Sequence, residues 1–282
     1  MRKIFSALTI AATAGTFAMP ALATDFIGKS NIDFFYAELE GGYSAFDGAS
    51  TIGSSISLQP DGGAYGTVTL GHVSIDDGII YGYVDRAELW FSYFDHGDDS
   101  LTVPGLSAKV DRDYWEVGTR FQHYYDQNAT NKMMWGFEPF YGEFSDNVVQ
   151  ITAGPTTATV DVDTSIYGAL LSFEYERTIA PATMLLFRAA GGVYGLNSDM
   201  NISGATTGSD SESTAGFRGQ LALGLKHQVN ERTSVGVVGR LDYFSDVARF
   251  DSTSGSNVIT TDDLLGASIG VNLNYIFGGT YQ

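Results

Sequence analysis

Apolar and polar residues alternate at every second position along much of this chain. The clearest example lies near the C-terminus: from Leu265 to Phe277 the odd positions are apolar or aromatic, and the even positions are Gly, Ser or Asn until Ile276. Because successive residues of a β-strand point to opposite faces, this segment predicts a strand with one apolar and one polar face. A helix would require apolar residues three and four positions apart, and they do not form the repeat here.

The same alternation recurs in ten segments, which together predict the fold. Each segment is close to the roughly 9–11 residues that a tilted strand needs to cross a bilayer. We therefore expect an all-β protein, a transmembrane antiparallel up-and-down β-barrel of about ten strands. The segments are Phe35–Ala45, Ala64–Val73, Tyr83–Tyr93, Trp115–Phe121, Met133–Tyr141, Tyr167–Tyr175, Leu185–Tyr194, Ala215–Leu225, Val235–Tyr243 and Leu265–Phe277.

The connections between these segments alternate in length. The long ones are Asp47–Gly63, Asp95–Asp111, Ser145–Val162, Leu196–Thr214 and Asp246–Thr261. The short ones are Ser74–Gly78, Asp126–Lys132, Arg177–Thr183 and Gln228–Arg232. Long outer loops and short periplasmic turns are the layout of an outer-membrane barrel, whereas a soluble β-sandwich, the alternative, gives no reason for strict alternation. Within one long connection, Asn147–Ile151 and Thr156–Val162 flank a Gly-Pro turn and predict strands that project beyond the membrane.

Aromatic residues on the predicted lipid-facing positions gather towards the ends of the segments. Amphipathic rings belong at the headgroup level of a bilayer, so these positions predict the two aromatic girdles of a membrane barrel. Ordinary β-propensity is the alternative explanation, and it accounts for Phe better than for Tyr at strand ends. The girdle residues are Tyr43, Tyr83, Tyr93, Trp115, Trp135, Tyr141, Tyr167, Tyr175, Tyr243 and Tyr275.

The N-terminal 23 residues have the features of a secretory signal peptide. Arg2 and Lys3 precede an apolar run from Ile4 to Met19, and Ala21-Leu22-Ala23 supplies small residues before a cleavage site. We expect cleavage after Ala23, export through the periplasm to the bacterial outer membrane, and one barrel domain over residues 24–282. A retained membrane anchor is the alternative, but no stop-transfer pattern follows.

Composition and charge narrow the range of partners. The chain has 34 Gly, 16 Tyr and 18 Phe but no Cys, so the fold must hold without disulfide bonds. Its formal charge is −18, and the predicted signal peptide carries two cations and no acid, which leaves the mature chain near −20. This sign argues against nucleic acid and against an anionic membrane surface as partners.

The final strand resembles the C-terminal signal by which bacterial outer-membrane barrels are recognised for insertion. The residues that carry the resemblance are Ser268, Gly270, Leu273, Tyr275 and Phe277. The resemblance implies contact with the barrel-assembly machinery during insertion. The chain departs from the pattern in two ways, because Leu273 is aliphatic and five residues follow Phe277.

The pattern of the whole predicted mature chain resembles that of outer-membrane barrel proteins. The stretches Asp113–Phe121, Phe187–Tyr194 and Leu221–Tyr243 are similar to pore-forming major outer-membrane proteins of the Legionella type. That likeness implies a porin-like function.

The inward-facing positions of the predicted strands carry many charges. In a narrow pore, opposed acidic and basic walls would select solutes. Ten strands lie just above the roughly eight at which side chains fill a barrel, so the charges could instead pair across a small lumen, which is the reading we favour. The inward residues are Glu38, Glu40, Arg86, Glu88, Glu116, Arg120, Glu138, Glu174, Glu176, Arg188, Arg218, Lys226, Arg240 and Asp242.

The long connections are strongly acidic, with 13 Asp or Glu against two cations. Asp95, Asp98 and Asp99 lie together at the outer rim. Acids of one sign around a rim attract divalent cations, which would also bridge to the phosphates of lipopolysaccharide. In a conducting barrel the same acids would favour the passage of cations.

Enzymatic motifs are weak in this sequence. The omptins, ten-stranded outer-membrane proteases, place Asp pairs and an Asp-His dyad at the outer rim, and Asp95-His96 lies at such a position. Adjacent residues on an extended strand point apart, so Asp95 would not orient His96. No phosphate loop, metal motif or Gly-x-Ser-x-Gly elbow occurs, and no cofactor is expected. We expect a non-enzymatic barrel, either a narrow passive pore or a surface-structural protein, with an adhesin or receptor as the alternative.

Overall fold

The computed structural model describes residues 32–47, 50–52, 56–58, 62–75, 78–80, 82–104, 106–127, 130–153, 156–204, 207–245, 247, 249–250, 259–261 and 263–281. Every secondary-structure element assigned in these residues is a β-strand. No helix in these ranges is long and apolar enough to cross a membrane. The predicted signal peptide, residues 1–23, lies outside the described ranges.

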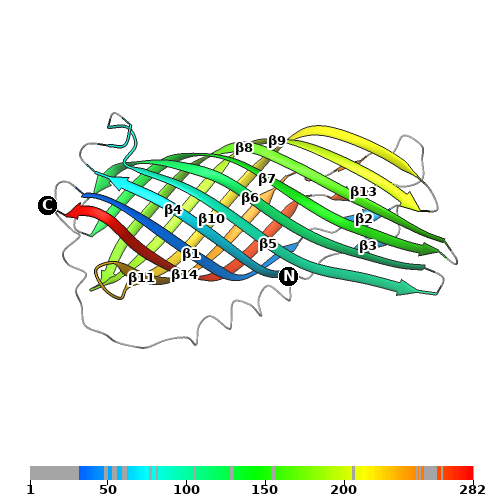
Figure 1. Ribbon diagram of the computed structural model, residues 1–282, viewed down its shortest axis with the longest axis horizontal. Helices are drawn as coiled ribbons and strands as arrows, with labels where there is room; N and C mark the ends of the chain where they lie inside the picture. Colours follow the sequence, from blue (N-terminus) through cyan, green and yellow to red (C-terminus); the bar gives the residue numbers. More distant parts are fainter. Residues whose placement is uncertain are drawn as a thin grey trace.

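Ten long antiparallel strands form a closed barrel (Figure 1). They are β1 Ile32–Asp47, β4 Gly63–Ser74, β5 Arg86–Val103, β6 Leu106–Gln127, β7 Asn131–Ala153, β8 Thr156–Ala180, β9 Thr183–Gly204, β10 Gly208–Gln228, β11 Thr233–Phe244 and β14 Leu264–Tyr281. Each strand pairs with the next along the chain, and β1 pairs with both β4 and β14. The predicted strand number and antiparallel order are confirmed.

Four short strands form a separate sheet in the order β12-β13-β2-β3. They are β2 Ser50–Ile52, β3 Ile56–Leu58, β12 Arg249–Phe250 and β13 Ile259–Thr261. They arise from the first and last of the long connections. One edge of this sheet, β3, lies against β5, and the other edge, β12, lies against β10.

The outward face of the barrel is an apolar band, as the alternation predicts. Leu39, Leu223 and Val271 are 54%, 58% and 62% exposed, while their sequence neighbours point inward. Aliphatic and aromatic side chains at these exposures would be costly in water. The band therefore marks the surface that contacts lipid.

The predicted start of the third strand at Tyr83 is wrong. Strand β5 begins at Arg86, and Tyr83 lies in the preceding turn with 77% of its surface exposed. Gly78 and Gly82 have φ values of +65° and +75°, which glycine adopts readily and other residues rarely do. The glycine turn interrupts the alternation that had suggested a strand from Tyr83 onward.

The long connections are largely β-hairpins rather than loops. The projecting strands expected at Asn147–Ile151 and Thr156–Val162 are confirmed as parts of β7 and β8. Asp95–Asp111 and Leu196–Thr214 were expected to be loops, and this is wrong, because β5–β6 and β9–β10 continue through them. The strands persist there because inward residues such as Val110 and Leu196 are buried in one apolar cluster. Figure 1 shows these hairpins extending far beyond one end of the barrel.

Placing a cation on the apolar band tests the assignment of faces. Leu223→Arg should lower the free energy of unfolding by about 2–4 kcal/mol, the cost of a cation near the middle of a bilayer. Denaturant titration of the protein in lipid vesicles measures this cost. Leu223→Phe, which stays apolar, should be close to neutral. Equal stability of the Arg and Phe variants would show that Leu223 does not face lipid.

Candidate functional site

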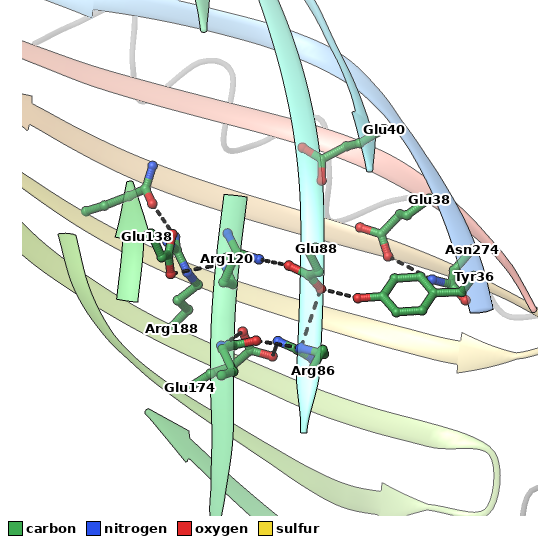
Figure 2. A network of polar contacts seen from close by, with 12 residues as sticks. Tyr36, Glu38, Glu40, Arg86, Glu88, Arg120, Glu138, Glu174, Arg188 and Asn274 are labelled. Carbon is green, nitrogen blue, oxygen red and sulfur yellow. Dashed lines mark hydrogen bonds and ion pairs between the residues drawn. The ribbon is translucent and has the colours of Figure 1, made fainter. Parts of the chain in front are cut away.

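The charged residues expected in the lumen do point inward, and the barrel brings them together in ion pairs. A continuous chain of pairs runs over five strands, β5 to β9, and Figure 2 shows its central part. Arg86 binds Glu174 at 2.7 Å and lies 3.4 Å from Glu88. Arg120 then bonds Glu88 at 2.6 Å.

The chain continues from Arg120 along the barrel wall to β7 and β9. This guanidinium lies 3.0 Å from Glu138, and Glu138 in turn binds Arg188 at 2.5 Å. At the other end, Glu176 lies within 3.8 Å of both Arg86 and Lys132. Each carboxylate between two cations is compensated from both sides. Such a network is rigid, because moving one member leaves another charge unpaired in a medium of low dielectric constant.

A second cluster spans the lumen between strands that are not neighbours. Arg218 on β10 binds Glu116 on β6 at 2.7 Å and lies 3.3 Å from Asp242 on β11. Tyr114 donates to Glu116 at 2.6 Å, and Gln220 donates to Asp242 at 2.6 Å. Three barrel strands separate β6 from β10, so this pair crosses the interior.

Two further pairs connect β1 to strands that lie beyond its neighbour β14. Glu40 receives two hydrogen bonds from the guanidinium of Arg240 on β11, one of them 2.5 Å long. Glu38 lies 3.3 Å from the ammonium of Lys226 on β10. Each inward acid and base that the sequence indicates thus has an opposite charge within reach; most pairs run along the inner wall, and Glu116–Arg218 crosses the lumen.

Sequence reasoning did not foresee the tyrosines that complete this network. Tyr36, Tyr65 and Tyr114 point inward and donate hydrogen bonds to Glu88, Glu40 and Glu116 respectively. Their inward direction could be predicted from the alternation, because each has the opposite parity to the outward-facing apolar residues of its strand. Their acceptors depend on register and could not be read from the sequence.

Above the ion pairs, the outer half of the lumen is filled by an apolar layer. Phe244 is fully buried, and its ring meets those of Tyr114, Phe144 and Tyr194 at 5.6–6.1 Å between centroids. The guanidinium of Arg218 lies 4.5 Å from the same ring, a cation–π contact that joins the two layers. The layer consists of Phe46, Trp90, Ala108, Val110, Tyr114, Phe140, Phe144, Val160, Val162, Ile166, Leu170, Tyr194, Leu196, Met200, Phe244, Val247 and Leu264.

Below the apolar layer, a cavity of about 320 Å³ occupies the lumen. Its deepest lining residues include Trp90, Phe94 and Leu170, which also belong to or pack against the apolar layer. At the other end Thr130, Ala182 and the exposed Arg232 line it, all in the short turns. Because short turns lie on the periplasmic side of outer-membrane barrels, the cavity is a cup that opens towards the periplasm.

The predicted rim acids lie on β5 within the β5–β6 hairpin. Asp95 accepts a hydrogen bond from the backbone N–H of Gly97 at 2.9 Å, and Asp99 accepts one from Ser100 at 2.8 Å. Asp98 pairs with Lys109 on β6 at 2.9 Å. This hydrogen bond and the charge of Lys109 hold the pKa of Asp98 below its usual value.

The predicted insertion signal lies on β14, the strand that closes the barrel against β1. Leu273, Tyr275 and Phe277 point outward and are 43–46% exposed, whereas Ser268 and Gly270 belong to the inward set. The strand continues past Phe277 to Tyr281 and pairs there with the start of β1. The extra residues after Phe277 therefore lengthen the closing strand. A role in insertion stays a prediction.

Asp95 and His96 do not form a dyad. The imidazole of His96 is 1% exposed and packs against Phe46 at 4.4 Å between ring centroids. Neither of its ring nitrogens has a hydrogen-bond partner among the described residues. Burial and the charge of Arg112 lower the pKa of His96 to about 3. The described residues also contain no group of three or more His, Asp or Glu side chains able to hold a metal ion.

Comparisons with known proteins show the fold. No protein-family profile and no curated protein sequence matches this chain. The outer membrane protease OmpT from Escherichia coli is similar in structure, with a TM-score of 0.64, 8% identity, and coverage of 93% of this chain and 100% of that one. At this identity the likeness concerns the fold alone, which is that of bacterial outer-membrane β-barrels.

Two further outer-membrane barrels are similar at lower scores. The translocator domain of the autotransporter NalP from Neisseria meningitidis has a TM-score of 0.46 and 12% identity, covering 98% of this chain and 94% of that one. A major outer membrane protein from Thermus thermophilus has a TM-score of 0.42 and 10% identity, covering 87% and 99%. Outer-membrane localisation agrees with the apolar band around this barrel.

Breaking one lumen-spanning pair should be costly. Arg218→Met removes the cation between Glu116 and Asp242, and we expect a loss of about 3–5 kcal/mol because both carboxylates stay buried. Denaturant titration in lipid vesicles measures the loss. The double variant Glu116→Gln/Arg218→Met should lose clearly less than the single variant. A double variant as unstable as the single one would show that the pair is not coupled.

The buried His96 should make stability sensitive to acid. Its pKa is about 3 in the folded protein but near 6.5 in an unfolded chain, so the unfolded state takes up the proton first as pH falls. Stability that is complete above pH 6.5 should drop by about 3 kcal/mol between pH 7 and pH 4. In denaturant titrations at both pH values, His96→Phe should remove most of this drop. An unchanged pH dependence would mean that other groups cause it.

Proposed function

We propose that this barrel, which has the fold of bacterial outer-membrane proteins, is a closed, non-enzymatic surface protein that holds a rigid, acidic β-structure above the membrane. The observation that carries the proposal is the apolar layer in the outer half of the lumen. Apart from Val247, its buried side chains come from eight of the ten barrel strands. A lumen packed in this way offers no continuous path for water or ions.

The part of the protein above the membrane is built as a second ring of strands. Strands β5 to β10 continue upward as a tall wall, while β4 and β11 have only 12 residues each. The four-stranded sheet lies between the two free edges of this wall, with β3 against β5 and β12 against β10. Val110, Val160 and Met200 of the apolar layer are buried inside this ring. Loops would not need such a core, which supports a structural role for the extension.

Acidic residues on the outer face of the extension support its use as a surface that binds a partner. On the tall wall, Asp163 lies opposite Asp199 and Asp95 lies opposite Asp113. Like charges on facing strand positions repel one another unless a cation lies near. We therefore include divalent cations, and through them lipopolysaccharide phosphates, as partners of this surface. The same surface would serve an adhesin or receptor, which is the alternative function.

The absence of an enzymatic role is part of the proposal. OmpT is a protease with the same fold, but a shared fold does not carry a shared reaction. The candidate His96 is enclosed by aromatic rings and has no carboxylate partner among the described residues. A general base needs to reach its substrate within hydrogen-bond distance, and a buried imidazole does not. This geometry supports a non-catalytic barrel.

Single-channel recording in planar bilayers tests the closed lumen. The folded wild-type protein should give no stable conductance steps at moderate voltage, because the apolar layer excludes water from the outer half of the barrel. Steady steps from correctly folded protein would overturn the closed form and favour the porin-like function instead. In that case the acidic rim predicts cation preference, and neutralising Asp95, Asp98 and Asp99 to Asn should weaken it.

A further inference from the structure

The lower half of the lumen has a feature that a structural role does not require, namely a cup that its side chains leave unfilled. On the β5–β9 side, the wall is the network of ion pairs (Figure 2). On β4 and β14 several lining residues are small and neutral, namely Thr67, Thr69, Ser268, Asn272 and Asn274, whereas β1 between these strands contributes Tyr36, Glu38 and Glu40. A lumen that only had to be filled would carry large side chains at these small neutral positions as well.

The charges that line the cup are already compensated. Eight lining acids and seven lining bases each lie within 4 Å of an opposite charge, and the only other two, Glu231 and Arg232, lie at the mouth. A charged ligand would have to separate one of these pairs, which costs several kcal/mol in a buried site. The electrostatics therefore favour a ligand without net charge.

The deep end of the cup combines an indole with hydroxyl groups. Trp90 lines the cavity, and its ring packs over Gly118, where a Cβ would lie 2.5 Å from the indole Cζ2. Thr69 stands directly opposite Trp90 in the β4–β5 ladder and also lines the cavity. Next to them, Thr67 and Ser92 hydrogen-bond to each other at 2.8 Å. An aromatic surface beside hydroxyl groups suits the apolar and hydroxyl faces of a sugar ring.

We propose that the cup is a binding site for a small neutral polyhydroxylated molecule of saccharide type, which enters from the periplasm. The volume of about 320 Å³ lies at the lower end of the roughly 300–1,000 Å³ found for small-molecule pockets. The ligand rests on Trp90 and exchanges hydrogen bonds with Thr69 and the amides of β14. The proposal depends on a closed outer end, which makes the lumen a pocket and not a path.

The tryptophans provide a direct assay for this site. Trp90 is the inward one, whereas Trp115 and Trp135 point outward to the lipid. In a Trp115→Phe/Trp135→Phe background, emission reports on the cup alone. Titration of the folded protein with glucose and maltose should change the Trp90 emission in a saturable way, and spermidine and glutamate should not.

Matched hydroxyl deletions locate the site. Thr69→Val should weaken sugar binding about two- to tenfold, the effect of one lost hydrogen bond. Thr119→Val removes a hydroxyl from an outward position of β6 and should leave binding unchanged. Absence of a saturable signal with both sugars, a response only to the charged probes, or equal effects of the two Thr variants would each overturn the proposal. Conductance recorded on the same preparation separates these outcomes from failure of the closed-barrel function.

Discussion

The structure depends on one constraint: within a bilayer, each backbone N–H and C=O must find its partner inside the protein. A sheet meets this requirement only if it has no edge, and here the pairing of β1 with β14 removes the last edge. That ladder runs from Ile32 opposite Tyr281 to Asp47 opposite Leu265. The apolar band is a consequence, because the closed sheet then faces lipid on one side throughout its height.

Closing ten strands creates an interior that has to be stabilised. Polar strand faces turned inward would be unfavourable in a narrow lumen if their charges stood alone. The barrel meets this by interleaving acids and bases along its inner face, so that pairs such as Glu116–Arg218 and Glu38–Lys226 connect strands that are not neighbours. Apolar residues in place of these pairs could give the barrel the same stability. Any other register of the strands, however, would leave buried charges unpaired, which is costly. The ion pairs therefore serve mainly to specify one arrangement of the strands.

The two layers of the lumen give the barrel two unlike ends. Phe244, among rings from the facing strands, closes the outer end, and the contact with Arg218 joins this layer to the charged one. Below, the neutral residues of β4 and β14 leave space that the ion pairs do not fill. The outer end is thus built for rigidity, and the periplasmic end retains room for a small molecule.

The sequence by itself determined the strand number, the faces of each strand and the inward charges, because side-chain direction has a period of two along a strand. It also indicated the hairpin on either side of the Gly-Pro turn. It could not show that β5–β6 and β9–β10 extend as strands, since Val110 and Leu196 become a core only when opposite walls meet. The partners of Glu116 and Glu138, the tyrosine donors and the cup were decided by the tertiary structure alone. They depend on which residues of distant strands reach the same level of the barrel, and that follows from register and closure.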